Sequence, residues 1–324
     1  FRGLHPDVRL GTASDRYAGW VGQIYSSDRY AGRVAHRTNR VGGKNFKEEV
    51  LPVESVEEYF EHFPVLELDF TFYRLLLGAD GEPGRSHHVL RTYAKHLKKR
   101  DRILIKVPQA VFSRKIRRSG AFVENEEYLD PDIFARRFYE PALALLDPWL
   151  EGFIFEQEYR RKQEQPSLQD FSRVLDRFFG SIPADGRYHV ELRTERFLAP
   201  AVFEVFERHG LGQVFSHWTW LPTLSRQFSL CGGRFTNALK AGVVRLMTPR
   251  GMRYEDAYAK SHPFDRLVEG MMSPNMVEHT VALMREAVSR DVRLNIIVNN
   301  RAGGNAPLIA RRIAARFVDG TGSG

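Results

Sequence analysis

Eight short apolar segments recur along the chain, and most are separated by segments with a helical period of hydrophobic residues. The predicted strands are Val8–Ala13, Val65–Thr71, Arg102–Val107, Gly152–Glu156, Tyr188–Arg193, Gln213–His217, Val243–Met247 and Leu294–Asn299. The predicted helices are Val56–His62, Ser86–Lys99, Pro131–Leu146, Ser167–Phe179, Ala199–His209, Pro274–Arg290 and Pro307–Phe317. Asp132 and Ser167 lie where helix N-caps are expected.

This alternation of strands and helices favours parallel strands joined by right-handed crossovers. Eight such units in 324 residues fit an α/β fold of TIM type, an irregular (β/α)8 barrel. We expect a single domain over residues 1–319 and a flexible tail over residues 320–324. An open doubly wound sheet is the alternative, although no GxGxxG motif follows the first strand.

Two segments interrupt this rhythm. Residues 26–54 carry six basic side chains among Gly, Ser and Asn, and we expect them to form a long basic loop after the first strand: Arg29, Arg33, Arg37, Arg40, Lys44 and Lys47. The segment Trp218–Lys240 is rich in Ser, Thr, Gly and Pro. In a barrel, such loops surround the carboxyl ends of the strands, where active sites lie. The alternative for the first segment is a solvated basic loop without a ligand.

Charged residues occupy strand positions that apolar side chains would normally fill. In the segment from Val65 to Arg74, Glu67 and Asp69 alternate with apolar residues. If they face inwards they need partners, because an unpaired buried charge is costly. The candidates are Glu156, Glu191 and the cations Lys106, Arg193 and Arg245 at the ends of other strands.

These charges allow two interpretations. One is a closed network of ion pairs that fills the barrel, and the other is an open pocket with cations for an anionic ligand and carboxylates for acid–base chemistry. For the pocket, the predicted catalytic residues are Glu67, Lys106, Glu191, Arg193 and Arg245. The predicted ligand-binding residues are Thr12, Trp20, Tyr73, His217, Asn299, Asn300 and Asn305.

A metal site is a weaker hypothesis. Glu156, Glu191 and His217 lie at the ends of consecutive strands and could hold a divalent ion, but the neighbouring cations would repel it. Cys231 is the only cysteine, which excludes a cysteine zinc site within one chain. No GxSxG motif is present. We therefore expect neither a metal nor a cofactor.

The overall charge bears on the partner. A net charge of +8 favours an anionic small molecule or a nucleic acid, and Tyr17, Trp20 and Tyr30 could stack on bases. No apolar run approaches the length of a membrane span, and no signal peptide is visible, so we expect a cytoplasmic protein without membrane contact. A third possibility is a non-catalytic interaction scaffold. The oligomeric state does not follow from the sequence.

Six ordered motifs resemble the family known as domain of unknown function 72, also called YecE-like. They are Leu10–Ser14 with Trp20 and Tyr25, Glu67 with Thr71–Arg74, Lys106–Pro108, Glu191–Arg193, Arg245, and Asn299–Asn300 with Ala306–Pro307. The resemblance implies a TIM-type barrel but no established activity. Fold analogy with endonuclease IV and xylose isomerase-like proteins suggests nucleic-acid or sugar-phosphate substrates, although the histidine-rich zinc cluster of endonuclease IV is not found here. Ala13–Asp15, Phe155–Tyr159 and Leu246–Thr248 depart from the family pattern.

Overall fold

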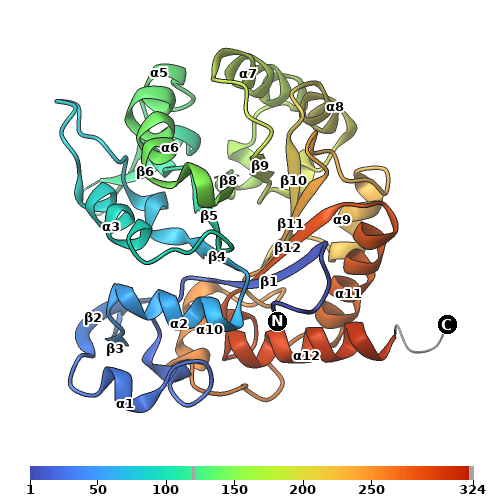
Figure 1. Ribbon diagram of the computed structural model, residues 1–324. Coiled ribbons are helices and arrows are strands. Elements are labelled where there is room, and N and C mark those ends of the chain that lie inside the picture. The colour runs from blue at the N-terminus through green and yellow to red at the C-terminus, as the bar shows by residue number, and fades with distance from the viewer. Residues whose placement is uncertain (119–120, 321–324) are drawn as a thin grey trace.

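The computed structural model describes residues 1–118 and 121–320 and contains a closed barrel of eight parallel strands (Figure 1). The barrel strands, in chain order, are β1 (Val8–Ala13), β4 (Val65–Leu68), β5 (Arg102–Lys106), β8 (Leu150–Glu156), β9 (Tyr188–Glu191), β10 (Gly212–His217), β11 (Ala241–Leu246) and β12 (Arg293–Val298). The order around the barrel follows the chain, and β12 pairs with β1 to close it. The predicted TIM-type fold is therefore confirmed.

Helices cover the outside of the barrel (Figure 1). The longer ones are α2 (Val56–His62), α3 (Arg85–Ala94), α6 (Glu140–Leu146), α7 (Leu168–Ser181), α8 (Pro200–Arg208), α10 (Tyr254–Ser261), α11 (Pro274–Ser289) and α12 (Ala306–Asp319). Their apolar faces and the outward side chains of the strands form one large buried core. No helix of the described residues is both long enough and apolar enough to cross a membrane.

One predicted helix cap is wrong. The side chain of Asp130, rather than Asp132, accepts the hydrogen bond from the backbone of Ile133 at 2.9 Å and starts α5 (Pro131–Phe134). The helix begins at Pro131, as predicted, so the residue before this proline, Asp130, is the N-cap. Ser167 caps α7 as predicted, because its hydroxyl accepts from the Asp170 amide at 3.0 Å.

The basic segment 26–54 is not the loop that its composition predicts. It contains α1 (Ser27–Tyr30) and an antiparallel hairpin of β2 (Ala35–Val41) and β3 (Lys44–Val50). Gly42 and Gly43 have φ of 56° and 79°, which is the left-handed pair that a tight hairpin turn requires. Most hairpin side chains are exposed, so the strands lack the apolar alternation that would have identified them.

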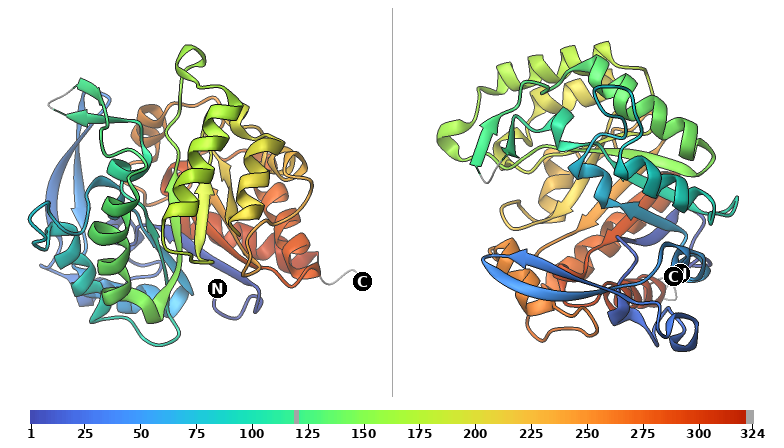
Figure 2. Two further views of the ribbon diagram at one scale, coloured as in Figure 1. Left: turned by 90° about the horizontal axis from the view of Figure 1, so that it is seen from above. Right: turned by 90° about the vertical axis from the view of Figure 1, so that its left-hand side faces the viewer.

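Several more elements, among them α10, are not predicted from the sequence. A second hairpin, β6 (Lys115–Arg118) with β7 (Ala121–Glu124), follows the short helix α4 (Gln109–Phe112), and both hairpins project to the same side of the barrel (Figure 2). The segment Trp218–Lys240 contains α9 (Leu224–Leu230), capped by the hydroxyl of Thr223. Gly320 ends α12, and the rest of the predicted tail lies outside the described residues.

The strand predicted over Val65–Thr71 is shorter than expected. It ends at Leu68, and a 3₁₀ turn, η3 (Asp69–Tyr73), replaces its last residues. Thr71 fixes this turn, because its hydroxyl donates to the Lys106 carbonyl at 2.7 Å and accepts from the Lys106 amide at 3.0 Å. The turn takes Asp69 away from the inward-facing row that begins with Glu67.

The inside of the barrel has an apolar layer and a charged layer. The apolar layer consists of seven buried side chains, each from a different strand, and Met247, which directly follows β11. The seven are Ala13, Val65, Leu104, Ile154, Val214, Val243 and Ile297. Charged side chains at the carboxyl ends of β4, β5, β8, β9 and β11 form the second layer. This arrangement places the charges at the barrel mouth.

Candidate functional site

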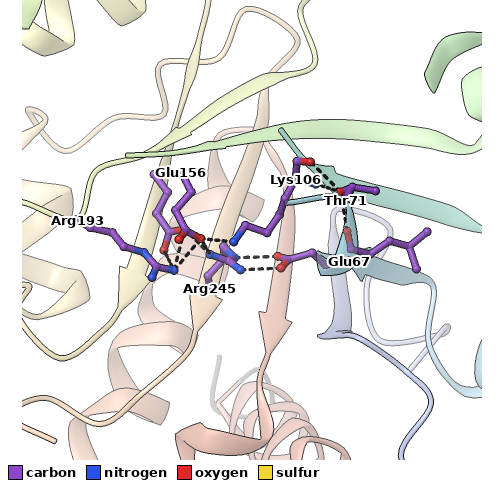
Figure 3. Close-up of polar contacts among 8 residues, drawn as sticks. Glu67, Thr71, Lys106, Glu156, Arg193 and Arg245 are labelled. Carbon is purple, nitrogen blue, oxygen red and sulfur yellow. Dashed lines mark hydrogen bonds and ion pairs between the residues drawn. The ribbon is translucent and has the colours of Figure 1, made fainter. Parts of the chain in front are cut away.

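Arg245 is the centre of the charged layer. Its Nε and Nη2 atoms donate to the two carboxylate oxygens of Glu67 at 2.8 and 2.6 Å, a bidentate pair between β11 and β4 (Figure 3). Its Nη1 atom donates to Glu191 and, at 3.3 Å, to Glu156. One guanidinium group therefore contacts three carboxylates from three strands.

Two further cations complete the network. Lys106 donates to Oε2 of Glu156, and Arg193 donates to the same oxygen at 2.9 Å (Figure 3). Arg193 also reaches both oxygens of Glu191 at 3.4 Å. We call the six residues Glu67, Lys106, Glu156, Glu191, Arg193 and Arg245 the mouth network. Its three carboxylates and three cations balance one another.

The pKa values in the mouth network follow from burial and pairing. Burial raises the pKa of Glu67 despite the contact with Arg245. Burial opposes ionisation of Glu156 as well, but Arg193, Lys106 and Arg245 outweigh it and hold the pKa of this carboxyl well below its usual range. Burial lowers the pKa of Lys106, with Glu156 acting against it. The paired state thus keeps Glu156 ionised across the physiological range.

A cavity of about 1040 Å³ opens above the mouth network. Four members of the network line it, namely Lys106, Glu156, Arg193 and Arg245, whereas Glu67 and Glu191 lie behind them and are fully buried. The network is therefore closed in its pairing, yet it also forms the floor of an open pocket. Both interpretations of the sequence describe part of it.

Aromatic rings cover the two cations that lie at the edge of the floor. The Lys106 ammonium is 3.9 Å from the centre of the Phe72 ring, and the Arg193 guanidinium is 4.9 Å from the centre of the Trp218 ring. Both rings line the cavity. Each cation is thus held by an aromatic face as well as by a carboxylate.

The walls of the cavity come from η3, the start of α3, the hairpin β2–β3 and the loops around α10 and β12. The hairpin is held in place against α10, where Phe46 packs on Tyr258 at 5.0 Å between ring centres and the Tyr258 hydroxyl donates to Glu48. The basic segment thus contributes a wall of the cavity through Arg37 and Lys47.

Five basic residues on these walls form no ion pair within the described part of the chain: Arg16, Lys47, Arg74, Arg85 and Arg301. We call them the rim cations. Arg74, Arg85 and Lys47 are exposed, and Arg301 lies 4.6 Å from the centre of the Tyr254 ring. Asp69 and Asp265 on the same walls also form no ion pair in the described chain, so the rim, unlike the floor, carries an excess of positive charge.

Three predicted ligand-binding residues line the cavity: Tyr73, Asn299 and Asn300. Tyr73 is 65% exposed. Asn300 has a structural duty as well, because its side-chain oxygen accepts from the indole of Trp20 at 3.2 Å and from the Ala306 amide at 2.8 Å. These bonds fix the loop that precedes α12 against the first loop of the barrel.

The structure does not bring four other predicted ligand-binding residues to the cavity surface: Thr12, Trp20, His217 and Asn305. Trp20 is fully buried, and Tyr30 is 4% exposed, so neither can stack on a base. Asn305 caps α12 by accepting from the Leu308 amide at 2.9 Å. Trp20 and Asn305 hold the loops in place through their hydrogen bonds, and sequence spacing alone does not distinguish this role from contact with a ligand.

The structure does not place the three candidate metal ligands, Glu156, Glu191 and His217, around a common position. His217 lies apart from the floor, and burial lowers its pKa to about 4, so it is neutral there. Glu156 and Glu191 are held by cations. Among the described residues, no three histidine, cysteine or carboxylate side chains converge on a position for a metal ion.

Most of the residues that line the cavity are not among the predicted site residues, and Glu156 and Arg301 are two examples. From the sequence, Glu156 is expected only as an ion-pair partner or a metal ligand, and the rim residue Arg301 is not singled out. Glu156 had a signal, because it ends a strand of otherwise apolar residues. Arg301 had none, since only the fold brings the loop after β12 to face the 3₁₀ turn after β4.

A family model described as "Protein of unknown function DUF72" matches residues 9–322. The solved DUF72 family protein from Thermotoga maritima superposes with a TM-score of 0.57 at 15% identity, covering 98% of this chain and 99% of that one. A solved DUF72 family protein from Enterococcus faecalis superposes with a TM-score of 0.57 at 13% identity, covering 96% of this chain and 95% of that one. At these identities, the similarity to the solved structures shows a shared fold and nothing further. No curated protein sequence matches.

Proposed function

The chain belongs to the DUF72 family of unknown function, and we propose that its mouth cavity binds an anionic, phosphate-bearing small molecule. The observation that carries this proposal is the set of rim cations without ion pairs around a cavity of about 1040 Å³. A volume of this order matches the upper end of small-molecule sites. Arginine side chains are well suited to bind phosphate because their N–H groups match its oxygens.

In this proposal the mouth network forms the floor on which the ligand lies. Lys106, Arg193 and Arg245 are the predicted catalytic residues that line the cavity. Arg193 also keeps a buried Nε atom without a hydrogen-bond partner in the described chain. Glu67 and Glu191 then serve as positioning residues, since they hold Arg245 from behind. Tyr73, Asn299 and Asn300 are the remaining predicted contacts.

Titration calorimetry with ribose 5-phosphate at low salt tests the proposal. The double variant Arg74→Gln/Arg301→Gln should bind about tenfold more weakly or worse, because each charge-assisted hydrogen bond is worth roughly 1.5–3 kcal/mol. Arg312→Gln, an exposed arginine on α12 without an ion pair in the described chain, is the matched control and should bind like the wild type. Equal affinity of all three proteins, or no binding at all, would reject the proposal.

A second candidate is single-stranded nucleic acid, favoured by aromatic rings beyond the cavity. Tyr159 and Trp220 are each 46% exposed, and Tyr159 lies 5.9 Å from Trp218 and 6.0 Å from Trp220 between ring centres. Exposed aromatic rings beside cations are typical of single-strand binding. Labelled oligonucleotides should then bind with an affinity that falls steeply with salt and falls further in Trp220→Ala.

A further inference from the structure

Asp69 differs from the other carboxylates at the strand ends. Glu67, Glu156 and Glu191 each contact at least one cation of the mouth network. Asp69 lines the same cavity, is half-buried, and has no hydrogen bond or ion pair from its side chain within the part of the chain that the structure describes. It is therefore a carboxylate available to a ligand.

The position of Asp69 follows from the end of β4. Since the strand stops at Leu68, the 3₁₀ turn directs Asp69 to the cavity wall instead of the barrel interior. Thr71 fixes the turn through its two hydrogen bonds with the backbone of Lys106. A carboxylate on a fixed turn is a defined acceptor rather than a mobile surface group.

Aromatic rings and a cation surround this acceptor. Tyr17, Tyr73 and Tyr254 line the cavity with Asp69, and the last two are 65% and 42% exposed. Burial, and after it the charge of Asp69, raises the pKa of the Tyr17 hydroxyl, which places the carboxylate in its electrostatic reach. Arg301 lies over Tyr254 at 4.6 Å. The wall thus offers an acceptor, flat faces and a phosphate-binding group together.

An ionised carboxylate accepts hydrogen bonds and donates none, so its ligand must present N–H or O–H groups. Proteins read nucleobases in the same way, by stacking on aromatic rings and by hydrogen bonds to the base edge. This inference rests on the proposed function. We propose that Asp69 accepts hydrogen bonds from the base of a nucleoside phosphate. Guanine is the preferred base because it offers adjacent N–H donors. The rim cations hold the phosphate of the same molecule.

The test compares GMP with ribose 5-phosphate, which shares the sugar phosphate and lacks the base. GMP should bind the wild type about tenfold or more tightly than ribose 5-phosphate, as expected for two hydrogen bonds to a charged group. Asp69→Asn should remove this advantage. It should leave the affinity for ribose 5-phosphate unchanged or higher, because the variant loses a negative charge near an anion.

Asp265→Asn is the matched control, since Asp265 is an exposed carboxylate that also lines the cavity. It should preserve the preference for GMP. Tyr73→Leu should weaken the binding of GMP more than the binding of ribose 5-phosphate, because only the base can stack on the ring. The thermal midpoint of each variant shows that the fold is intact.

Each outcome decides between the two claims. Equal binding of GMP and ribose 5-phosphate by the wild type would overturn the role of Asp69 and leave the phosphate site standing. An equal loss of GMP affinity in Asp69→Asn and Asp265→Asn would also overturn it, because the effect would then be general electrostatics. Failure of both ligands to bind would reject the proposed function itself.

Discussion

Arg245 and Glu67 form a bidentate ion pair across the barrel, with N–O distances of 2.8 and 2.6 Å, although 178 residues separate them in the chain. Their strands, β11 and β4, are not neighbours, because β12 and β1 lie between them. The pair therefore spans the lumen instead of following the sheet. It closes the mouth from below and makes the charged floor a single unit.

We predict that Arg245→Met strongly destabilises the protein. The variant leaves Glu67 and Glu191, both fully buried, without their main cation, and breaking a buried pair costs about 3–5 kcal/mol. Urea denaturation measures the loss in the free energy of unfolding. Arg312→Met, the surface control, should change it by less than about 0.5 kcal/mol. A stability like that of the wild type would mean that the network does not support the fold.

Lys106→Met should affect ligand binding more than stability. Glu156 keeps Arg193 and Arg245 as partners in this variant, and the new side chain can still pack on Phe72. We expect a loss of about 1–2 kcal/mol in stability and a clear loss of affinity for ribose 5-phosphate by calorimetry. If stability falls and affinity does not, the floor serves the fold alone.

Asp15 should make stability depend on pH. It is fully buried and accepts from the Tyr93 hydroxyl at 2.8 Å, and burial raises its pKa from 3.8 to about 6. The folded state thus binds more protons than the unfolded chain between these values, so this contribution to stability is present below pH 4 and is lost as pH rises to about 6.

Asp15→Asn removes this titration. At pH 7 the variant should be more stable than the wild type by up to about 3 kcal/mol, and the difference between the two should shrink towards pH 4. Urea denaturation at several pH values measures the difference, in which the titrations of all other groups cancel. A constant difference across the range would show that Asp15 is not the group that titrates.

Trp20→Phe should lower stability and leave ligand affinity unchanged. The ring is fully buried, and its indole N–H donates to Asn300 at 3.2 Å, a bond that phenylalanine cannot make. We expect a loss of about 1–2 kcal/mol in thermal or urea denaturation. A loss of affinity for ribose 5-phosphate at unchanged stability would instead place Trp20 at the ligand.

The barrel fold could be predicted from the sequence because each of its strands is a short apolar segment that can be recognised locally. The charged ends of those strands also revealed five of the six members of the mouth network as candidate catalytic residues, with Glu156 as a partner. The hairpin β2–β3 could not be predicted in the same way, because most of its side chains are exposed and its strands bury little apolar surface. Its Gly42–Gly43 turn was the available signal.

Burial was the harder property to predict. Trp20 and Asn305 have the chemistry of ligand-binding residues, and only the packed structure shows that both are fully buried. Asp69 illustrates the reverse case. Strand alternation placed it on the same inward face as Glu67, and the early end of β4 at Leu68 placed it on the cavity wall.

A crystal structure grown with saturating ribose 5-phosphate tests the central claim most directly. The account predicts that the phosphate lies in the mouth cavity, within hydrogen-bond distance of Arg74 or Arg301. A cavity that stays free of the ligand at saturating concentration, or a phosphate bound elsewhere on the protein, would contradict it.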